Sequence, residues 1–158
     1  MQDWLVIQIR PRWEKKVARQ LEQKGIETYC PLVKERHQWS DRVKVVERPL
    51  FRSYVFVKIS ENQRTDVRLT PGVINFVYRN GKLVVLKERR ICSIREFQQL
   101  YPEVRVLEKV FLERQTNSKN SGLIMEEKIV TLPLKVLDMT LVAFTGQQKR
   151  NAATIDNI

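Results

Sequence analysis

Residues 53–59 carry apolar side chains on both faces of one predicted strand. Successive side chains of an extended segment point to opposite faces. The two faces hold Val55, Val57 and Ile59 on one side and Tyr54 and Phe56 on the other. A strand with one solvated face alternates apolar and polar residues, and this one does not. We therefore expect one face to line the core and the aromatic face to be covered by another element or by a partner.

The first half of the chain alternates between strand and helix patterns. Trp4–Ile9 reads as a strand, and Pro11 and Gly25 are placed as the start and end of a helix. An apolar stripe that would face a sheet runs along this helix at Trp13, Val17, Ala18 and Leu21. A second strand is predicted over 26–33, interrupted by Pro31, followed by a projecting hairpin over 36–48.

The pattern continues with a short helix, a strand, a turn and a longer helix. Ser60 is a suitable N-cap for a helix that ends before Pro71, and a strand is predicted over 73–77. Asn80-Gly81 predicts a turn before the apolar residues 83–86. The last helix spans residues 87–100, with inward positions expected at Ile91, Ile94, Phe97 and Leu100.

This order of elements predicts an α+β sandwich in residues 1–100, with helices covering one face of an antiparallel sheet. The other face would carry Tyr54 and Phe56, joined by Trp4 and Val6. After residue 100 the character changes. We expect a linker over 101–122, whose polar stretch 115–122 is poor in apolar groups. Short apolar runs in 123–158 predict a small β-barrel there.

Charge is concentrated in the first hundred residues. The chain has a formal net charge of +11, and residues 1–100 hold 21 Lys and Arg against 11 Asp and Glu. Such an imbalance favours a surface for nucleic acid or another polyanion. The exposed side of the first helix is basic and could contact phosphates or simply be solvated; its residues are Arg12, Lys15, Lys16 and Arg19.

Composition also limits the class of protein. With 42% apolar residues the chain can bury a core. No apolar run approaches the roughly 20 residues that span a bilayer, and no signal peptide is evident, so we expect a cytoplasmic monomer without a membrane partner. Cys30 and Cys92 are expected to be buried free thiols, and His37 a solvated residue of the hairpin. Nothing predicts a metal, a cofactor or an enzyme.

The aromatic face admits three interpretations: core covered by the C-terminal segment, a platform for stacking bases, or a docking surface for protein. Arg52–Ile59 partly matches the octamer of RNA-recognition motifs, which favours an RRM-like module that binds single-stranded RNA. Ser53 and Val55 replace the small residues of that octamer, and Ile59 replaces its final aromatic residue. The match is therefore partial.

Several motifs, in order across residues 3–98, resemble the N-terminal domain of NusG-type transcription elongation factors. The motifs are Trp4-Leu-Val-Ile, Lys15-Lys-Val, Leu21-Glu-Gln-Lys-Gly-Ile, Tyr29-Cys-Pro-Leu, Pro49-Leu-Phe-Arg-Ser-Tyr-Val-Phe-Val and Thr70-Pro-Gly-Val. The fifth is the most specific. Length and lack of insertions resemble the specialised RfaH-like antiterminators more than the general factor. The resemblance implies a non-catalytic factor that binds bacterial RNA polymerase and promotes processive elongation, either generally or at selected operons.

The resemblance also implies residue roles. In the family the apolar sheet face docks on the coiled coil of the clamp in the largest polymerase subunit. The matching positions here are Trp4, Val6, Phe51, Tyr54 and Phe56. Gln63, Arg64 and Thr65 match a second polymerase contact, where paralogues have His-Thr-Thr and only Thr65 keeps its residue type. The basic first helix matches the region that faces the non-template DNA strand.

The C-terminal segment departs from the family, whose members end in a KOW-type barrel with glycines near its start. Leu132 and Val136 stand where glycines are expected, so the resemblance implies a degenerate KOW/SH3-like barrel in 123–158. Termination factor Rho or a ribosomal protein are the partners that the family implies for this segment. In some RfaH-like paralogues the tail covers the aromatic face of the free protein, although Pro133 argues against one long helix here.

Overall fold

The computed structural model describes residues 2–101, 103–108 and 129–144. The chain divides into two compact units, Met1–Glu96 and Phe97–Ile158. In the described ranges, no helix is long and apolar enough to cross a membrane.

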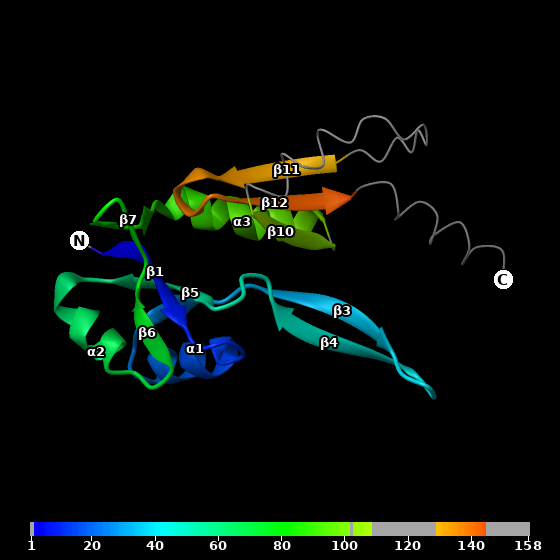
Figure 1. Ribbon diagram of the computed structural model, residues 1–158, viewed down its shortest axis with the longest axis horizontal. Coiled ribbons are helices and arrows are strands. Elements are labelled where there is room, and N and C mark those ends of the chain that lie inside the picture. The colour runs from blue at the N-terminus through cyan, green and yellow to red at the C-terminus, as the bar shows by residue number, and fades with distance from the viewer. Residues whose placement is uncertain (1, 102, 109–128, 145–158) are drawn as a thin grey trace. The chain divides into compact units, whose positions relative to one another are not determined.

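The first unit is built on a five-stranded sheet (Figure 1). Its strands are β1 (Asp3–Ile9), β2 (Glu27–Tyr29), β5 (Tyr54–Ile59), β6 (Val73–Phe76) and β9 (Val85–Leu86). Their order is β2-β5-β1-β6, with β9 also paired to β1, and the pairs are antiparallel. β1 is central, and its register with β5 places Val6 opposite Phe56 and Ile7 opposite Val55.

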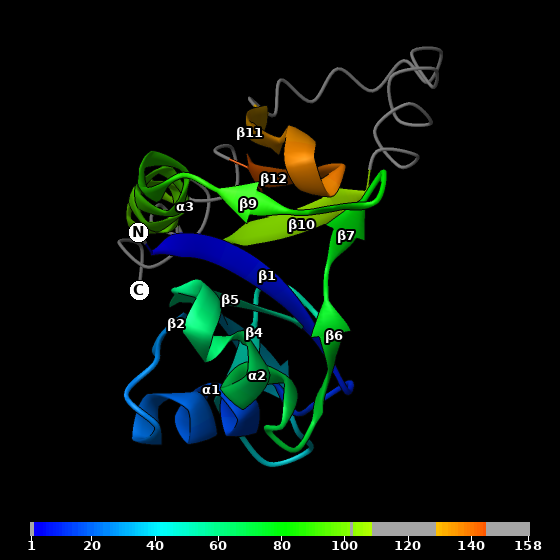
Figure 2. The ribbon, with the colours of Figure 1, turned by 90° about the vertical axis from the view of Figure 1, so that its left-hand side faces the viewer.

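The core lies between this sheet and two helices, α1 (Glu14–Gln23) and α2 (Arg64–Arg68), the latter preceded by the 3-10 turn η1 (Glu61–Gln63). Figure 2 shows α1 and α2 on the same side of the sheet. The buried core side chains are Leu5, Ile7, Ile9, Val17, Ala18, Leu21, Ile26, Val55, Val57, Ile59, Val67 and Phe76. The predicted stripe of α1 and the predicted inward face of β5 are both confirmed.

Two glycines have backbone conformations that other residues rarely adopt. Gly25 follows α1 with φ +78°, as predicted for the end of this helix. Gly72 has φ +95°, and a Cβ built there would lie 2.6 Å from Cε3 of Trp13 and 2.9 Å from Cγ2 of Val17. Gly72 thus lets the chain before β6 approach α1 closely. The helix itself begins at Glu14 rather than at Pro11, because Arg12 has φ 71° and lies in a turn.

The predicted hairpin forms a separate two-stranded sheet of β3 (Leu32–Gln38) and β4 (Val43–Pro49). It extends away from the rest of the first unit (Figure 1). β3 is distinct from β2, so the strand predicted over 26–33 divides around Pro31. A small hairpin of β7 (Tyr78–Arg79) and β8 (Lys82–Leu83) turns at Asn80 and Gly81, as predicted.

The expectation that helices cover only one sheet face is wrong. Helix α3 (Glu88–Leu100) contributes Glu88 and Arg95 to contacts with Trp4 and Tyr29, on the face opposite to α1. Ile91, Ile94 and Phe97 are buried as predicted, whereas Leu100 is 71% exposed. The inward face of α3 therefore ends at Phe97, and Leu100 at the end of the helix is not part of it.

The two thiols also differ from expectation. Cys30 is half-buried and Cys92 is exposed. Cys92 directly follows the buried Ile91, but it lies on the solvent side of α3 because consecutive helical residues are about 100° apart.

The described part of the second unit contains a three-stranded sheet. Its strands are β10 (Val104–Glu108), β11 (Ile129–Leu134) and β12 (Met139–Phe144), in the order β10-β12-β11, with the 3-10 turn η2 (Lys135–Leu137) between the last two. Pro133 lies in β11, an edge strand of this sheet, where a missing N–H is tolerated. The degenerate barrel stays a prediction. Within the range 101–122 that was predicted as a linker, residues 104–108 form the strand β10. The polar stretch 115–122 and the apolar run 152–155 lie outside the described residues.

Candidate functional site

Aromatic rings gather on the sheet face opposite to α1. Phe51 and Phe56 pack edge to face, with ring centroids 5.1 Å apart. The ring centroid of Tyr29 lies 6.0 Å from that of Phe56 and 6.5 Å from that of Trp4. We call Trp4, Tyr29, Phe51 and Phe56 the aromatic cluster. It brings together three residues that the sequence predicted for one site.

The predicted docking residues differ in exposure. Trp4, Val6, Phe51 and Phe56 are buried, and Tyr54 is half-buried. Tyr54 pairs with Gln8 across β1 and β5, at the end of the face away from Trp4. Of the predicted set, Tyr54 is therefore the residue whose side chain remains partly open to a partner.

The first turns of α3 contact the aromatic cluster. The guanidinium carbon of Arg95 lies 4.8 Å from the ring centroid of Tyr29, within the range of a cation–π contact. The indole Nε1 of Trp4 donates a hydrogen bond to Oε2 of Glu88, and Lys58 forms an ion pair with the same oxygen at 3.2 Å. These polar contacts hold the helix to the aromatic face at two points.

The titratable groups of this face respond to their surroundings. Burial raises the pKa of Tyr29 to about 12, although Arg95 acts in the opposite direction. The hydrogen bond from Trp4, followed by that from Lys58, lowers the pKa of Glu88. Both groups therefore keep their ordinary charge at neutral pH, Tyr29 neutral and Glu88 ionised.

The sequence interpretation did not assign a site role to Tyr29 or Glu14. Tyr29 pairs with Phe56 across β2 and β5, so its side chain shares the face of Phe56. Glu14 is buried, and its Oε1 accepts a hydrogen bond from the backbone N–H of Ser53 at 2.9 Å. Ser53 has φ 63° and enters β5. The strand parity of β2 could have revealed Tyr29, whereas no local pattern indicates the partner of Glu14.

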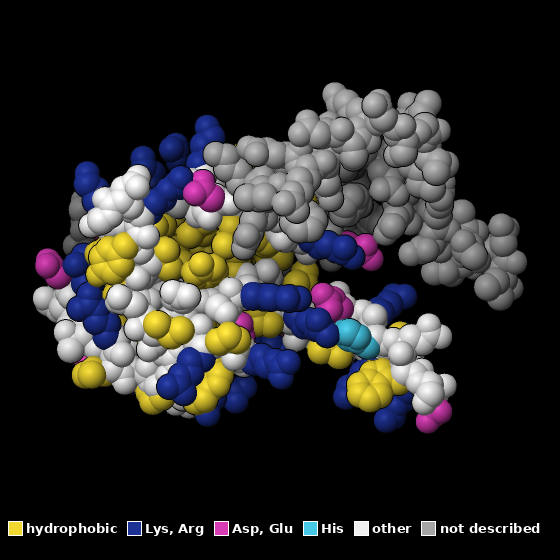
Figure 3. Space-filling view, in the orientation of Figure 1, with side chains coloured by type: hydrophobic (Ala, Val, Ile, Leu, Met, Phe, Trp, Pro, Cys, Tyr) yellow, Lys and Arg dark blue, Asp and Glu magenta, His cyan; other side chains and the backbone are white. Residues whose placement is uncertain are grey.

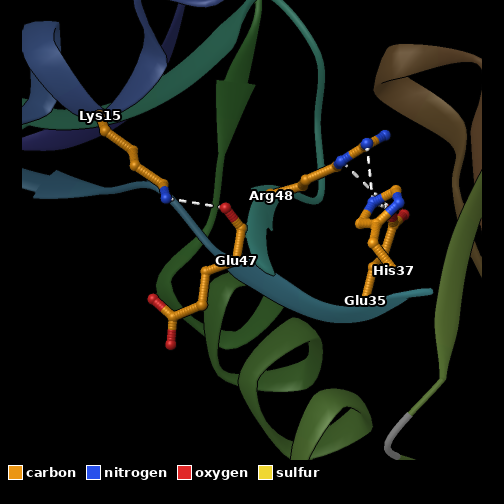
Figure 4. A network of polar contacts seen from close by, with 5 residues as sticks. All are labelled: Lys15, Glu35, His37, Glu47 and Arg48. Carbon is orange, nitrogen blue, oxygen red and sulfur yellow. Dashed lines mark hydrogen bonds and ion pairs between the residues drawn. The ribbon is translucent and has the colours of Figure 1, made fainter. Parts of the chain in front are cut away.

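The predicted basic surface is exposed: Lys15, Lys16 and Arg19 lie on α1, and Arg12 lies in the turn before it. Lys16 Nζ lies 4.2 Å from the centroid of the Trp13 ring. Lys15 Nζ donates a hydrogen bond to the backbone oxygen of Glu47 at 2.7 Å, which connects α1 to the base of the hairpin (Figure 4). The surface is thus open to an anionic partner, and Lys15 also donates one hydrogen bond to β4.

The three residues matched to the second polymerase contact, Gln63, Arg64 and Thr65, have different surroundings. Gln63 Oε1 accepts a hydrogen bond from the Ser60 backbone N–H at 3.1 Å and so closes the turn before α2. Arg64 is half-buried, and its Nε has no hydrogen-bond partner in the described part of the chain. Thr65 is exposed. Only Thr65 of the three presents its side chain fully to solvent.

The arrangement contains no group of three or more His, Cys, Asp or Glu suited to a metal ion within residues 2–101, 103–108 and 129–144. The first unit presents an aromatic sheet face and a basic surface on and beside α1. These features belong to a domain of the α+β class.

Comparison with known proteins places this domain in a family. Residues 2–95 match the family NusG, described as transcription termination factor nusG, which covers more than half of the chain. The chain therefore belongs to the NusG family, whose members are non-enzymatic transcription factors. The curated proteins contain no match to it.

Among solved structures, one described as "Domain interaction in Thermotoga maritima NusG" shares 25% sequence identity with this chain. The similarity covers 58% of this chain and 54% of that chain, with a TM-score of 0.36. The chain thus spans about half the length of the solved relative.

Proposed function

We propose that this protein is a transcription elongation and antitermination factor that binds bacterial RNA polymerase. The observation that carries the proposal is the family match over residues 2–95, which includes the aromatic cluster and the basic helix. Members of the NusG family typically interact with RNA polymerase. The factor would keep the enzyme in a processive state and suppress pausing or termination.

We assign docking on the polymerase clamp to the aromatic face. Aromatic side chains that become buried against a partner commonly contribute most to protein–protein affinity. The residues proposed for this contact are Trp4, Val6, Phe51, Tyr54 and Phe56. First contact would fall on Tyr54, because its side chain is partly open. Access of a partner to Trp4 would require the Glu88 carboxylate of α3 to give way.

Two further contacts complete the proposed mechanism. The basic surface of α1 would hold phosphates of the non-template DNA strand, which adds affinity without reading sequence. Thr65 and the neighbouring Arg64 would contribute the second polymerase contact, while Gln63 closes the turn before α2. Binding at several points would bridge polymerase and DNA.

The finer assignments rest on the sequence resemblance. We propose that the protein is an RfaH-like paralogue that acts at selected operons. Its C-terminal segment would form a degenerate KOW-like barrel that contacts Rho or the ribosome. Identification of the proteins that its C-terminal segment retains from a lysate would test this part separately.

An RRM-like platform for single-stranded RNA on the same face has weaker support. Stacking needs the flat face of a ring open to a base. Phe56 is fully buried and its ring packs against Phe51. We therefore do not propose this function for the aromatic cluster.

Retention of polymerase by the tagged full-length protein tests the docking proposal. Tyr54→Ala combined with Phe56→Ala should abolish retention, and Tyr54→Ala alone should reduce it. The single variant matters because Phe56→Ala removes a buried ring and costs about 3–5 kcal/mol. Tyr78→Ala is the matched control, since Tyr78 is an exposed tyrosine of β7. Retention that is unchanged in both Tyr54 variants would remove the proposal.

A further inference from the structure

The β3–β4 hairpin forms a long two-stranded arm. Seven residue pairs connect its strands, from Leu32 and Pro49 at the base to Gln38 and Val43 near the tip. At about 3.4 Å per residue the arm extends for roughly 20 Å. Beyond the last pair, the Trp39 backbone N–H donates to the Arg42 carbonyl at 2.9 Å and closes the turn. The arm is therefore well formed up to its tip.

One face of this arm is neutralised near its base. Cross-strand partners share a face of the hairpin, and so do alternate residues of one strand. Arg48 lies opposite Val33, so it shares a face with Glu35 and His37, which follow Val33 at alternate positions of β3. Glu35 forms an ion pair with Arg48 at 3.2 Å and lies 3.5 Å from Nε2 of His37 (Figure 4). Its charge is thus compensated locally.

The same face becomes cationic toward the tip. Lys44 pairs with His37 in the strand register, and Arg42 follows at the turn. Both are exposed, and neither forms a salt bridge with another described residue. Asp41 is the acidic residue beside them, so the tip keeps a net positive charge. Figure 3 shows Lys and Arg side chains beside hydrophobic ones at the free end of the hairpin.

Trp39 adds an exposed aromatic ring to these cations. Its side chain is 63% exposed, whereas Trp4 is 2% exposed and Trp13 is partly buried. A shallow hollow at the tip is lined by Trp39, Ser40, Asp41, Arg42 and Lys44. An indole beside two cations is the combination with which proteins hold unpaired nucleotides, since the ring stacks on a base while the cations contact phosphates.

We propose that the tip of the β3–β4 hairpin is a binding site for single-stranded nucleic acid. One unpaired base stacks on Trp39, and Arg42 and Lys44 hold the phosphates on either side of it. Stacking does not discriminate strongly between bases, so the site is sequence-tolerant. This site is separate from the aromatic cluster and from the basic surface of α1, and it does not depend on polymerase docking.

Affinity of the free full-length protein for short oligonucleotides tests this site. Fluorescently labelled 12-nucleotide DNA, RNA of the same length and a DNA duplex are titrated at two salt concentrations, and anisotropy is measured. Trp39→Ala should weaken single-strand binding by at least about fivefold, and Trp39→Phe should retain most of it. The DNA and RNA arms identify which strand is preferred.

The contribution of the cations is measured by salt dependence. For single strands, each neutralised phosphate contributes about 0.7 to the slope of log K against log salt, so Arg42→Gln with Lys44→Gln should lower the slope by about 1.4. Lys82→Gln with Lys87→Gln is the matched control, because it removes the same charge from exposed positions outside the β3–β4 hairpin. A slope that falls equally in both pairs indicates diffuse electrostatics and overturns the proposal.

Intrinsic fluorescence reports stacking directly. The chain has three tryptophans, and Trp39 is the exposed one. Oligonucleotide binding should quench the emission, and Trp39→Phe should lose this quenching. Lys16→Gln with Arg19→Gln removes two cations from α1 and should lower the affinity for the oligonucleotide. The quenching of Trp39 on binding should remain, which separates the two surfaces. Duplex binding that is indifferent to Trp39→Ala, or no single-strand binding at all, would overturn the proposal.

Discussion

The indole Nε1 of Trp4 donates a hydrogen bond to Oε2 of Glu88, 84 residues further along the chain. The bond connects the central strand β1 to the first turn of α3. Lys58 reinforces it from β5 by an ion pair with the same carboxylate oxygen. The Glu88 carboxylate therefore links the start of α3 to two strands of the sheet, β1 and β5.

This relationship predicts a dependence on pH. The folded-state pKa of Glu88 lies below its ordinary value, so the folded protein favours the ionised carboxylate. The stabilising contribution is full above the unfolded-state pKa and is lost as the pH falls through the folded-state pKa. The midpoint temperature of thermal unfolding is measured at neutral pH and at about pH 4. Between these two pH values it should fall less for Glu88→Gln than for the wild type. An equal loss would contradict the role of Glu88.

Glu14 is expected to stabilise the entry to β5. Glu14→Ala leaves the Ser53 backbone N–H without its buried acceptor, which costs about 1–3 kcal/mol. Glu14→Gln keeps an acceptor oxygen and should cost less. Urea denaturation gives the free energy of unfolding, and Glu27→Ala, at an exposed glutamate of β2, is the control. A Glu14→Ala protein as stable as this control would refute the prediction.

Gly72→Ala should destabilise the first unit by more than the strain of its φ angle alone. The new Cβ would meet Trp13 and Val17 at less than 3.0 Å. Gly81→Ala is a matched comparison, because Gly81 also has a positive φ but open space around its Cβ position. The strain of a positive φ alone costs an alanine about 1–2 kcal/mol. Equal free energies of unfolding for the two variants would show that Trp13 moves aside without cost.

The two thiols should react at different rates. Cys92 is exposed, whereas Cys30 is half-buried and desolvation raises its pKa to about 11. Because the thiolate is the reactive form, Cys92 should be alkylated first at neutral pH. Mass spectrometry after brief treatment with iodoacetamide measures the order. In Cys92→Ser the rapid alkylation should disappear. Rapid alkylation of this variant would show that Cys30 is the faster thiol and would contradict the prediction.

Much of the first unit could be predicted from periodicity alone. The apolar stripe of α1 and the two faces of β5 follow from spacings of 3.6 and 2 residues, and the turn at Asn80 and Gly81 follows from its residue types. The contacts of α3 could not be predicted in this way. Glu88 and Arg95 are charged residues on an exposed helix surface by pattern, and only the folded chain brings them to Trp4 and Tyr29.

The candidate site was predictable in its members but not in its accessibility. Strand parity assigned Trp4, Val6, Tyr54 and Phe56 to one face, and the structure places them there. Parity does not indicate what packs on a face, so the sequence left open whether this chain or a partner covers Trp4 and Phe56, which are buried in the structure. Strand parity within β2 puts Tyr29 on one face of that strand, but only the pairing of β2 with β5 in the folded sheet shows that this is the face of Phe56.

Site-specific photocrosslinking to RNA polymerase tests the central claim most directly. A benzophenone amino acid replaces Tyr54 in the full-length protein, and the same substitution at Tyr78 is the control. If the aromatic face docks on the clamp, the Tyr54 position should crosslink to the largest subunit and Tyr78 should not. Crosslinks from Tyr78 alone, with polymerase retained by both proteins, would contradict the proposal and place the polymerase contact on another surface.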